Sequence, residues 1–149
     1  MSLEKWVEYG WLKAEPSSPE EIGALLGIVT RALKDADVEA ISDDLRFQAA
    51  FSAALTAANV ALRASGYRTR VQTGHHQKMV ESMELTLKAD PKLIQKMKVL
   101  SKKRNATSYD SAGNVSEQEL EQAIKVASEL QQCVIDWLNE NHSELMRGC

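Results

Sequence analysis

The sequence is poor in residues that cross-link a chain or interrupt regular structure. Its 149 residues include two cysteines and three prolines, and aromatic residues make up 5%. A disulfide between Cys133 and Cys149 would require the end of the chain to fold back, so we expect two free thiols in a reducing cytoplasm. No cysteine or histidine spacing is typical of zinc. We therefore expect neither a metal nor a cofactor.

Long apolar runs are also missing. No segment approaches the ~20 consecutive apolar residues that cross a bilayer. The opening residues, MSLEKWVEYGWL, place acids and tryptophans where a signal peptide has a basic start and an apolar core. We expect a cytoplasmic protein without membrane contact. The 44% hydrophobic and 26% charged content is typical of one globular domain over residues 1–149.

Common catalytic and binding motifs are absent from the sequence. It has no glycine-rich phosphate loop, no Ser-His-Asp arrangement that can be placed, and no Glu-x-x-His pair for a di-iron site. The basic residues lie on a long helical segment without a short recognition unit, which disfavours a helix-turn-helix DNA reader.

The net charge of -3 conceals a basic middle segment. Between Arg63 and Arg104 there are eleven basic and three acidic residues, and the flanking segments are acidic. Such a segment can attract a polyanion although the whole chain is acidic. The alternative is that these charges are solvated faces balanced by acids of neighbouring helices.

Local signals predict the first two helices. A capping box at Ser18 starts the first, and Asp35-Ala36-Asp37 ends it. The second runs from about Val38 to Ser65 and is ended by Gly66. Its alanines allow a neighbouring helix to approach closely. Its predicted apolar stripe includes Ile41, Leu45, Phe51, Ala54, Leu55, Ala58 and Leu62.

Three more helices follow. Thr73 can cap the third, and Asp90-Pro91 starts the fourth. We expect the fourth to fray near Arg104, because residues 111–114 form a turn sequence. A second capping box at Ser116 opens the last helix. No segment indicates a strand, so the sequence predicts an all-α, up-and-down bundle of about five helices.

Residues 1–16 form a short extension that contains Trp6, Tyr9 and Trp11. The favoured interpretation is a small extra helix packed on the bundle. An exposed aromatic cluster used as an oligomer contact is the alternative.

The segment KKRNATSYD, residues 102–110, is the most informative part of the chain. Arg104, Asn105 and Tyr109 supply a fixed cation, an amide and a phenol, which suit an anion such as phosphate. Alternatively, Arg104 caps helix carbonyls or pairs with Asp110. The candidate binding residues around this centre are Lys102, Lys103, Asp110, His75 and His76.

His75 and His76 begin the third helix, and they are the candidates for acid–base chemistry. The helix start favours anion binding. One histidine can reach Arg104 if the third and fourth helices pack antiparallel. The alternative is that one histidine caps or packs and the other is solvated.

Three passages together resemble a HEPN domain, a helical family found in many prokaryotic toxin–antitoxin and antiviral proteins. They are NVALRASGYR (residues 59–68), TGHHQKMVESM (residues 73–83), and KKRNATSYD followed by a last helix that ends in DWL. The resemblance covers about Asp37 to Leu145.

The resemblance implies a metal-independent ribonuclease. The family signature is an arginine, a polar neighbour, and a histidine four to six residues after the arginine. Arg104 and Asn105 match, whereas Tyr109 stands at the histidine position. A tyrosine with a pKa near ~10 is a poor base at neutral pH, so Tyr109 better suits a hydrogen bond to phosphate or base stacking.

Several functions are consistent with this resemblance. The first is an RNA-binding or RNA-cleaving homodimer with Arg104 near the two-fold axis. Such a homodimer could serve as a component of a toxin–antitoxin system. The second is a catalytically silent homodimer that acts through a partner such as a nucleotidyltransferase. The third is a sensor that binds a nucleotide or another small ligand between its helices.

Overall fold

The computed structural model describes residues 2–70, 75–109 and 115–146, with His75 and residues 106–109 described as backbone only. This part of the chain is mostly helical, with one small sheet, which agrees with the predicted all-α class. Its elements are α1 (Leu3–Glu8), β1 (Leu12–Ala14), α2 (Pro19–Ala36), α3 (Asp43–Ala64), β2 (Tyr67–Thr69), α4 (His75–Thr86), α5 (Pro91–Tyr109), α6 (Glu117–Asn141) and a final 3-10 turn, η1 (Ser143–Met146).

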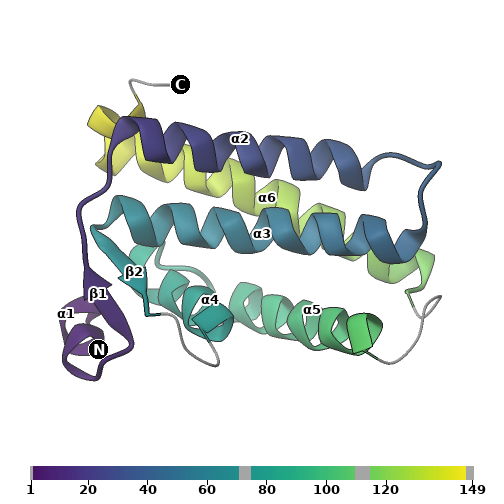
Figure 1. The fold of residues 1–149 in the computed structure, drawn as a ribbon, viewed down its shortest axis with the longest axis horizontal. Helices are drawn as coiled ribbons and strands as arrows, with labels where there is room; N and C mark the ends of the chain where they lie inside the picture. Colours follow the sequence, from purple (N-terminus) through teal and green to yellow (C-terminus); the bar gives the residue numbers. More distant parts are fainter. Residues whose placement is uncertain (1, 71–74, 110–114, 147–149) are drawn as a thin grey trace.

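Helix α3 is the centre of the bundle. It packs most extensively against α2 and α6, and it also contacts α4, α5 and β2. The helices α2, α3, α5 and α6 alternate in direction, and α6 lies behind α3 in the view of Figure 1. The five helices α2 to α6 therefore form the bundle, and α1 lies at one end of it.

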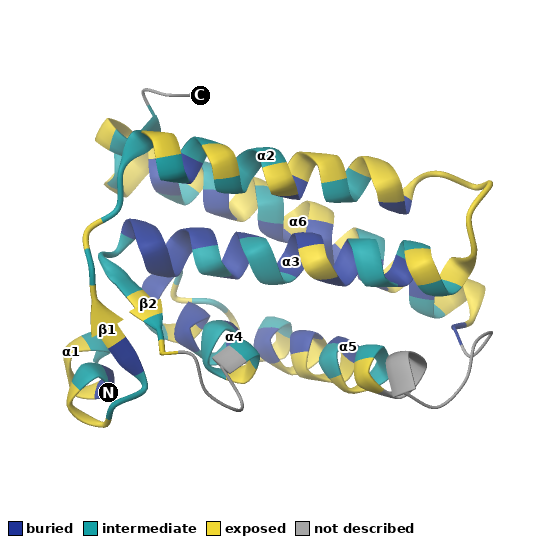
Figure 2. Cartoon of the chain, viewed as in Figure 1, coloured by how far each residue is buried: buried dark blue, intermediate teal, exposed yellow. Residues whose placement is uncertain are grey.

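The core follows the alanine-rich face of α3. Alanines 50, 53, 54, 57, 58 and 61 are buried almost completely, together with Phe47 and Val60. Small side chains let α2 and α6 approach the backbone of α3 closely, whereas the larger residues of those helices fill the remaining space. Figure 2 shows buried residues at intervals along α3, most densely at the end that leads into β2.

Helix α3 starts later than the sequence predicts. It begins at Asp43, and the Ser42 hydroxyl accepts a hydrogen bond from the Leu45 backbone N–H at 3.2 Å. The side-chain cap followed by two aspartates fixes this start, since acids stabilise the first turn of a helix. The predicted stripe was wrong at its beginning, because Ile41 and Leu45 are 37% and 55% exposed.

Other predicted helix ends are confirmed. The Ser116 hydroxyl accepts from the Glu119 N–H at 3.1 Å, and the Glu119 carboxylate accepts from the Ser116 N–H at 2.9 Å, a complete capping box. Gly66 follows α3 with a φ of +93°, the left-handed conformation that favours glycine after a helix.

Helix α5 does not fray at Arg104. It starts at Pro91, and the Asp90 carboxylate accepts a hydrogen bond from the Lys92 N–H at 2.8 Å. It continues to Tyr109, so Arg104 lies inside the helix. Its surrounding Lys, Arg, Asn and Ala residues contain no helix breaker, and the downstream turn sequence does not unwind the preceding turn.

The small sheet was not predicted from the sequence. β1 and β2 pair antiparallel in the register Leu12–Thr69, Lys13–Arg68 and Ala14–Tyr67. Each strand has three residues, too few to show an alternating pattern, and the pairing joins segments far apart in the chain. The expectation that no segment forms a strand is therefore wrong for these two short segments.

Trp6 of the N-terminal extension packs on the bundle, whereas Tyr9 is 52% exposed. Trp6 is 6% exposed and forms a small cluster with Leu12 and Leu62 of α3. Trp11 meets Trp6 edge to face, with ring centroids 5.5 Å apart. The Lys78 ammonium lies 3.6 Å from the Trp11 ring centroid, so the extension also contacts α4.

None of the helices within the described ranges has the length and apolar character needed to cross a bilayer. Within the same ranges, no group of three or more histidine, cysteine or acidic side chains is arranged to hold a metal ion. Cys133 is a free thiol, and burial raises its pKa.

Candidate functional site

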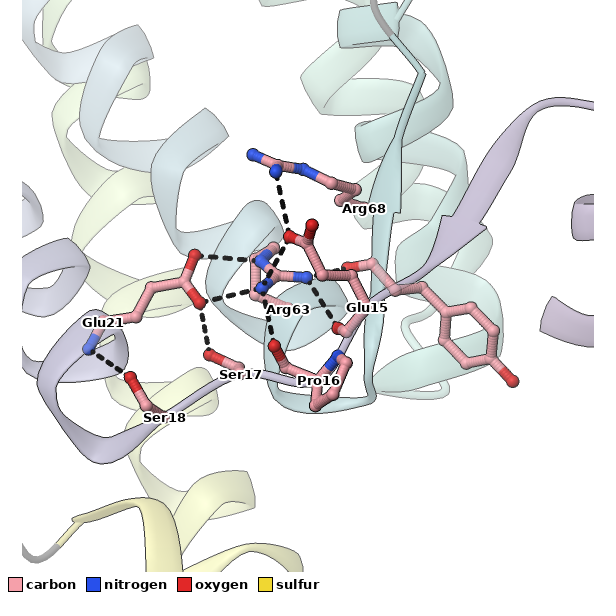
Figure 3. A network of polar contacts seen from close by, with 8 residues as sticks. Glu15, Pro16, Ser17, Ser18, Glu21, Arg63 and Arg68 are labelled. Carbon is pink, nitrogen blue, oxygen red and sulfur yellow. Dashed lines mark hydrogen bonds and ion pairs between the residues drawn. The ribbon is translucent and has the colours of Figure 1, made fainter.

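The most extensive polar network of the described residues surrounds Arg63. Its guanidinium is 3% exposed and forms a two-pronged pair with Glu21, with Nε–Oε2 and Nη2–Oε1 distances of 3.0 and 2.8 Å. Nη1 donates to the carbonyls of Glu15 and Tyr67, and Nη2 donates to that of Pro16. All five N–H donors of the guanidinium are thus used (Figure 3).

This network is a structural tie. It joins α3 to the start of α2, to the residues that follow β1 and to β2. The hydrogen bonds from Arg63 hold the pKa of Glu21 below its usual value, and one from Ser17 at 2.7 Å adds to this effect. Glu21 therefore does not complete the capping box predicted with Ser18, although the Ser18 hydroxyl accepts from its N–H at 3.1 Å. Arg63 does not contribute to an accessible basic surface.

Arg104 opens onto a different feature, a groove of about 430 Å³ that we call the Arg104 groove. Four helices contribute to its walls, which explains why no single sequence segment reveals it. Its lining residues are Leu25 and Ile28 of α2, Gln48, Phe51, Ser52, Leu55, Thr56 and Asn59 of α3, His76 and Met79 of α4, and Arg104 of α5.

The floor of the Arg104 groove is a polar stripe on α3. Gln48, Ser52, Thr56 and Asn59 follow one another at spacings of four, four and three residues, so they share one helix face. This face lies opposite the buried alanines. The sequence pattern of α3 indicates a packing helix and does not single out these residues. Their spacing was the signal that could have identified them.

The structure brings two predicted site residues together. Arg104, near the end of α5, and His76, in the first turn of α4, line the same groove. Among the described residues Arg104 forms no ion pair, and its Nη1 donates a long hydrogen bond of 3.4 Å to Oδ1 of Asn105. Its charge is therefore not neutralised by any carboxylate within the described ranges.

Lys102 and Asn105 line a second, adjacent groove of about 310 Å³, which we call the Lys102 groove. Consecutive residues of a helix point about 100° apart, so Arg104 and Asn105 face different grooves. The remaining lining residues of the Lys102 groove are Gln77, Val80, Lys98 and Ser101.

Lys103 turns away from both grooves. Its Nζ lies 3.3 Å from Oε2 of Glu119, at the start of α6. The backbone N–H of Ser116, aided by Lys103, holds the pKa of Glu119 below its usual value. Lys103 therefore supports the capping box of α6, and the structure does not place it beside Arg104.

Two other predicted site residues are located only in part. Tyr109 is the last residue of α5 and His75 the first of α4, and both are described as backbone. Asp110 lies outside the described residues, as does the proposed cap Thr73. The histidines do begin a helix, as the sequence predicts.

The lining of the Arg104 groove suits a ligand with both flat apolar and anionic parts. Ile28, Leu55 and Met79 provide apolar contact, and Arg104, Asn59 and Gln48 provide hydrogen-bond donors. A nucleotide has this combination, because its base has an apolar face and its phosphate accepts charged hydrogen bonds.

No family model matches the chain, and no curated protein or solved structure is significantly similar to it.

Proposed function

We propose that this chain is a HEPN-type RNA-binding protein that holds a phosphate of single-stranded RNA with Arg104. The observation that carries the proposal is the Arg104 groove, where an arginine without an ion-pair partner among the described residues stands beside His76 and the polar stripe of α3. A planar guanidinium suits a phosphate because it donates two parallel hydrogen bonds.

The charge of α5 supports an anionic ligand. All six charged residues of this helix are basic, and the helix lies at the edge of the bundle (Figure 1). Such a surface attracts nucleic acid through its phosphates regardless of sequence. RNA is favoured over duplex DNA because the groove offers apolar side chains on which an unpaired base can stack.

Binding is tested with a labelled single-stranded RNA at several salt concentrations. We expect Arg104→Ala to weaken binding about tenfold and to reduce the slope of log K against log salt by about 0.7, the value for one lost phosphate contact on a single strand. Arg31→Ala is the matched control, since Arg31 is exposed on α2 and does not line the groove. Equal binding by the two variants would contradict the proposal.

The shared position of His76 and Arg104 favours a second function, metal-independent cleavage of the bound RNA. In this reaction His76 accepts the proton of the ribose 2′-hydroxyl. The 2′-oxygen attacks phosphorus, and the 5′-oxygen leaves with a proton from solvent, giving a 2′,3′-cyclic phosphate. Arg104 balances the charge of the phosphorane. A histidine has an ordinary pKa near ~6.5 and can do this work at neutral pH, whereas Tyr109 as a phenol cannot.

Cleavage is tested by incubating total RNA with the protein in EDTA. We expect fragments with wild type, none with His76→Gln or Arg104→Ala, and RNA binding retained by His76→Gln. Fragments that persist in Arg104→Ala would indicate a contaminating nuclease. Intact RNA in every sample, with binding that still depends on Arg104, would leave binding as the function and exclude cleavage under these conditions.

A further inference from the structure

The Lys102 groove has the chemical character of an anion site. Its lining contains two lysine ammonium groups, from Lys98 and Lys102, two side-chain amides, from Gln77 and Asn105, and the Ser101 hydroxyl. Every one of these groups can donate a hydrogen bond, and there is no carboxylate among the described residues that line the groove. Val80 is the only apolar residue among them. The two ammonium groups therefore favour an anion over a cation.

The two lysines of this groove are not neutralised within the described part of the chain. Ion pairs there engage Arg63, Arg68, Lys78 and Lys103 of the basic middle segment, but neither Lys98 nor Lys102. They are four residues apart on α5, a spacing at which like charges repel each other and destabilise a helix. A bound anion would remove this repulsion.

A second lysine pair on the same helix provides a contrast. Lys92 and Lys96 are also four residues apart, but they line a groove of about 310 Å³ that contains the carboxylates of Asp90 and Glu129. Acidic side chains therefore accompany this lysine pair in the same groove. The same helix therefore has one lysine pair beside acids and one pair beside donors only.

The Lys102 groove adjoins the Arg104 groove along the contact between α4 and α5. On α5 the consecutive residues Arg104 and Asn105 face different grooves and share a hydrogen bond of 3.4 Å. On α4, His76 lines the Arg104 groove and the next residue, Gln77, lines the Lys102 groove. A strand that passes over this contact meets both grooves in succession.

We propose that the Lys102 groove is a second phosphate-binding position, which holds a neighbouring phosphate of the same RNA strand that Arg104 binds. This inference rests on the proposed function and extends it. It defines a path across the contact between α4 and α5 and assigns Lys98 and Lys102 to it, together with the donors Ser101 and Asn105. The ligand is a strand with at least two phosphates, and a mononucleotide fills one position only.

The test measures fluorescence anisotropy of a labelled 12-nucleotide oligouridine with the full chain at several potassium chloride concentrations. We expect Lys98→Ala/Lys102→Ala to bind about tenfold more weakly at low salt, with a salt slope smaller by about 0.7. Lys92→Ala/Lys96→Ala removes the same charge from the same helix and should change affinity less than twofold. Lys98→Arg/Lys102→Arg keeps both charges and should bind like wild type.

The possible outcomes separate the two proposals. If Arg104→Ala weakens binding but the two double-alanine variants bind equally well, the second position is wrong and the proposed function stands. If wild type does not bind RNA, or Arg104→Ala has no effect, both are wrong. Unchanged far-UV circular dichroism shows that the variants fold, as expected for exposed lysines. Uridine monophosphate should compete only weakly with the labelled oligonucleotide. If the mononucleotide and an unlabelled oligonucleotide compete equally well at the same phosphate concentration, a path that spans both grooves is refuted.

Discussion

Replacing Arg63 by methionine should destabilise the fold strongly, because no other side chain can replace its contacts. The Arg63 side chain is 3% exposed, and its guanidinium binds the Glu21 carboxylate, lies 3.3 Å from Oε2 of Glu15 and donates to three backbone carbonyls. Methionine retains most of the apolar stem but leaves these acceptors without their donors. Breaking a buried pair costs about 3–5 kcal/mol. The Glu21 side chain is 36% exposed, so its carboxylate can be hydrated when the arginine is removed. We therefore expect a loss at the low end of this range, about 3 kcal/mol.

The assay is urea unfolding followed by circular dichroism. With a slope of about 2 kcal/mol per molar urea, a loss of 3 kcal/mol lowers the midpoint by about 1.5 M. Arg68→Met is the matched control. Arg68 pairs with Glu15 at 2.9 Å but is 50% exposed, so its loss should cost less than about 1 kcal/mol. A midpoint shift below about 0.5 M for Arg63→Met would refute the reasoning.

The same network predicts a pH dependence. Arg63 lowers the pKa of Glu21 in the folded state, so the stabilisation is present above the ordinary glutamate value of about 4.3 and is lost as the pH falls through the lower folded value. The difference in stability between wild type and Arg63→Met should therefore shrink below about pH 4. A difference that stays constant between pH 7 and pH 3 would show that Glu21 is not the partner that matters.

Three further predictions concern stability and are checked by thermal or urea unfolding. Ser116→Ala removes the cap of α6 and should cost about 1 kcal/mol, whereas Ser128→Ala, exposed inside α6, should be neutral or slightly stabilising. Gly66→Ala should cost about 1 kcal/mol, because Gly66 has a φ of +93° that alanine adopts poorly. Gly27→Ala should instead stabilise the protein by about 0.5–1 kcal/mol, because Gly27 lies inside α2 and an added Cβ meets open space there. Lys78→Met should cost about 0.5–1 kcal/mol through the lost contact with Trp11 and should redden tryptophan fluorescence; an unchanged spectrum would contradict that contact.

The sequence alone determined the helices, because their signals are local. Serine caps, prolines and Gly66 act on the backbone within a few residues, and the apolar spacing of α2 and α6 requires a buried face. The errors at the start of α3 and the end of α5 have a local origin as well. At Ser42 a side-chain cap overrode an apolar pattern, and near Arg104 a downstream turn sequence had no effect on the preceding helix.

The tertiary structure decided everything that depends on residues far apart in the chain. It paired β1 with β2, buried Arg63 against Glu21, and directed Lys103 to Glu119. Each of these contacts occupies basic or polar groups that the sequence alone leaves available for binding a ligand. The Arg104 groove has the same origin, since its walls come from four helices. A local pattern can specify which face of a helix is polar, but only packing decides which helix covers that face and which face stays open to a ligand.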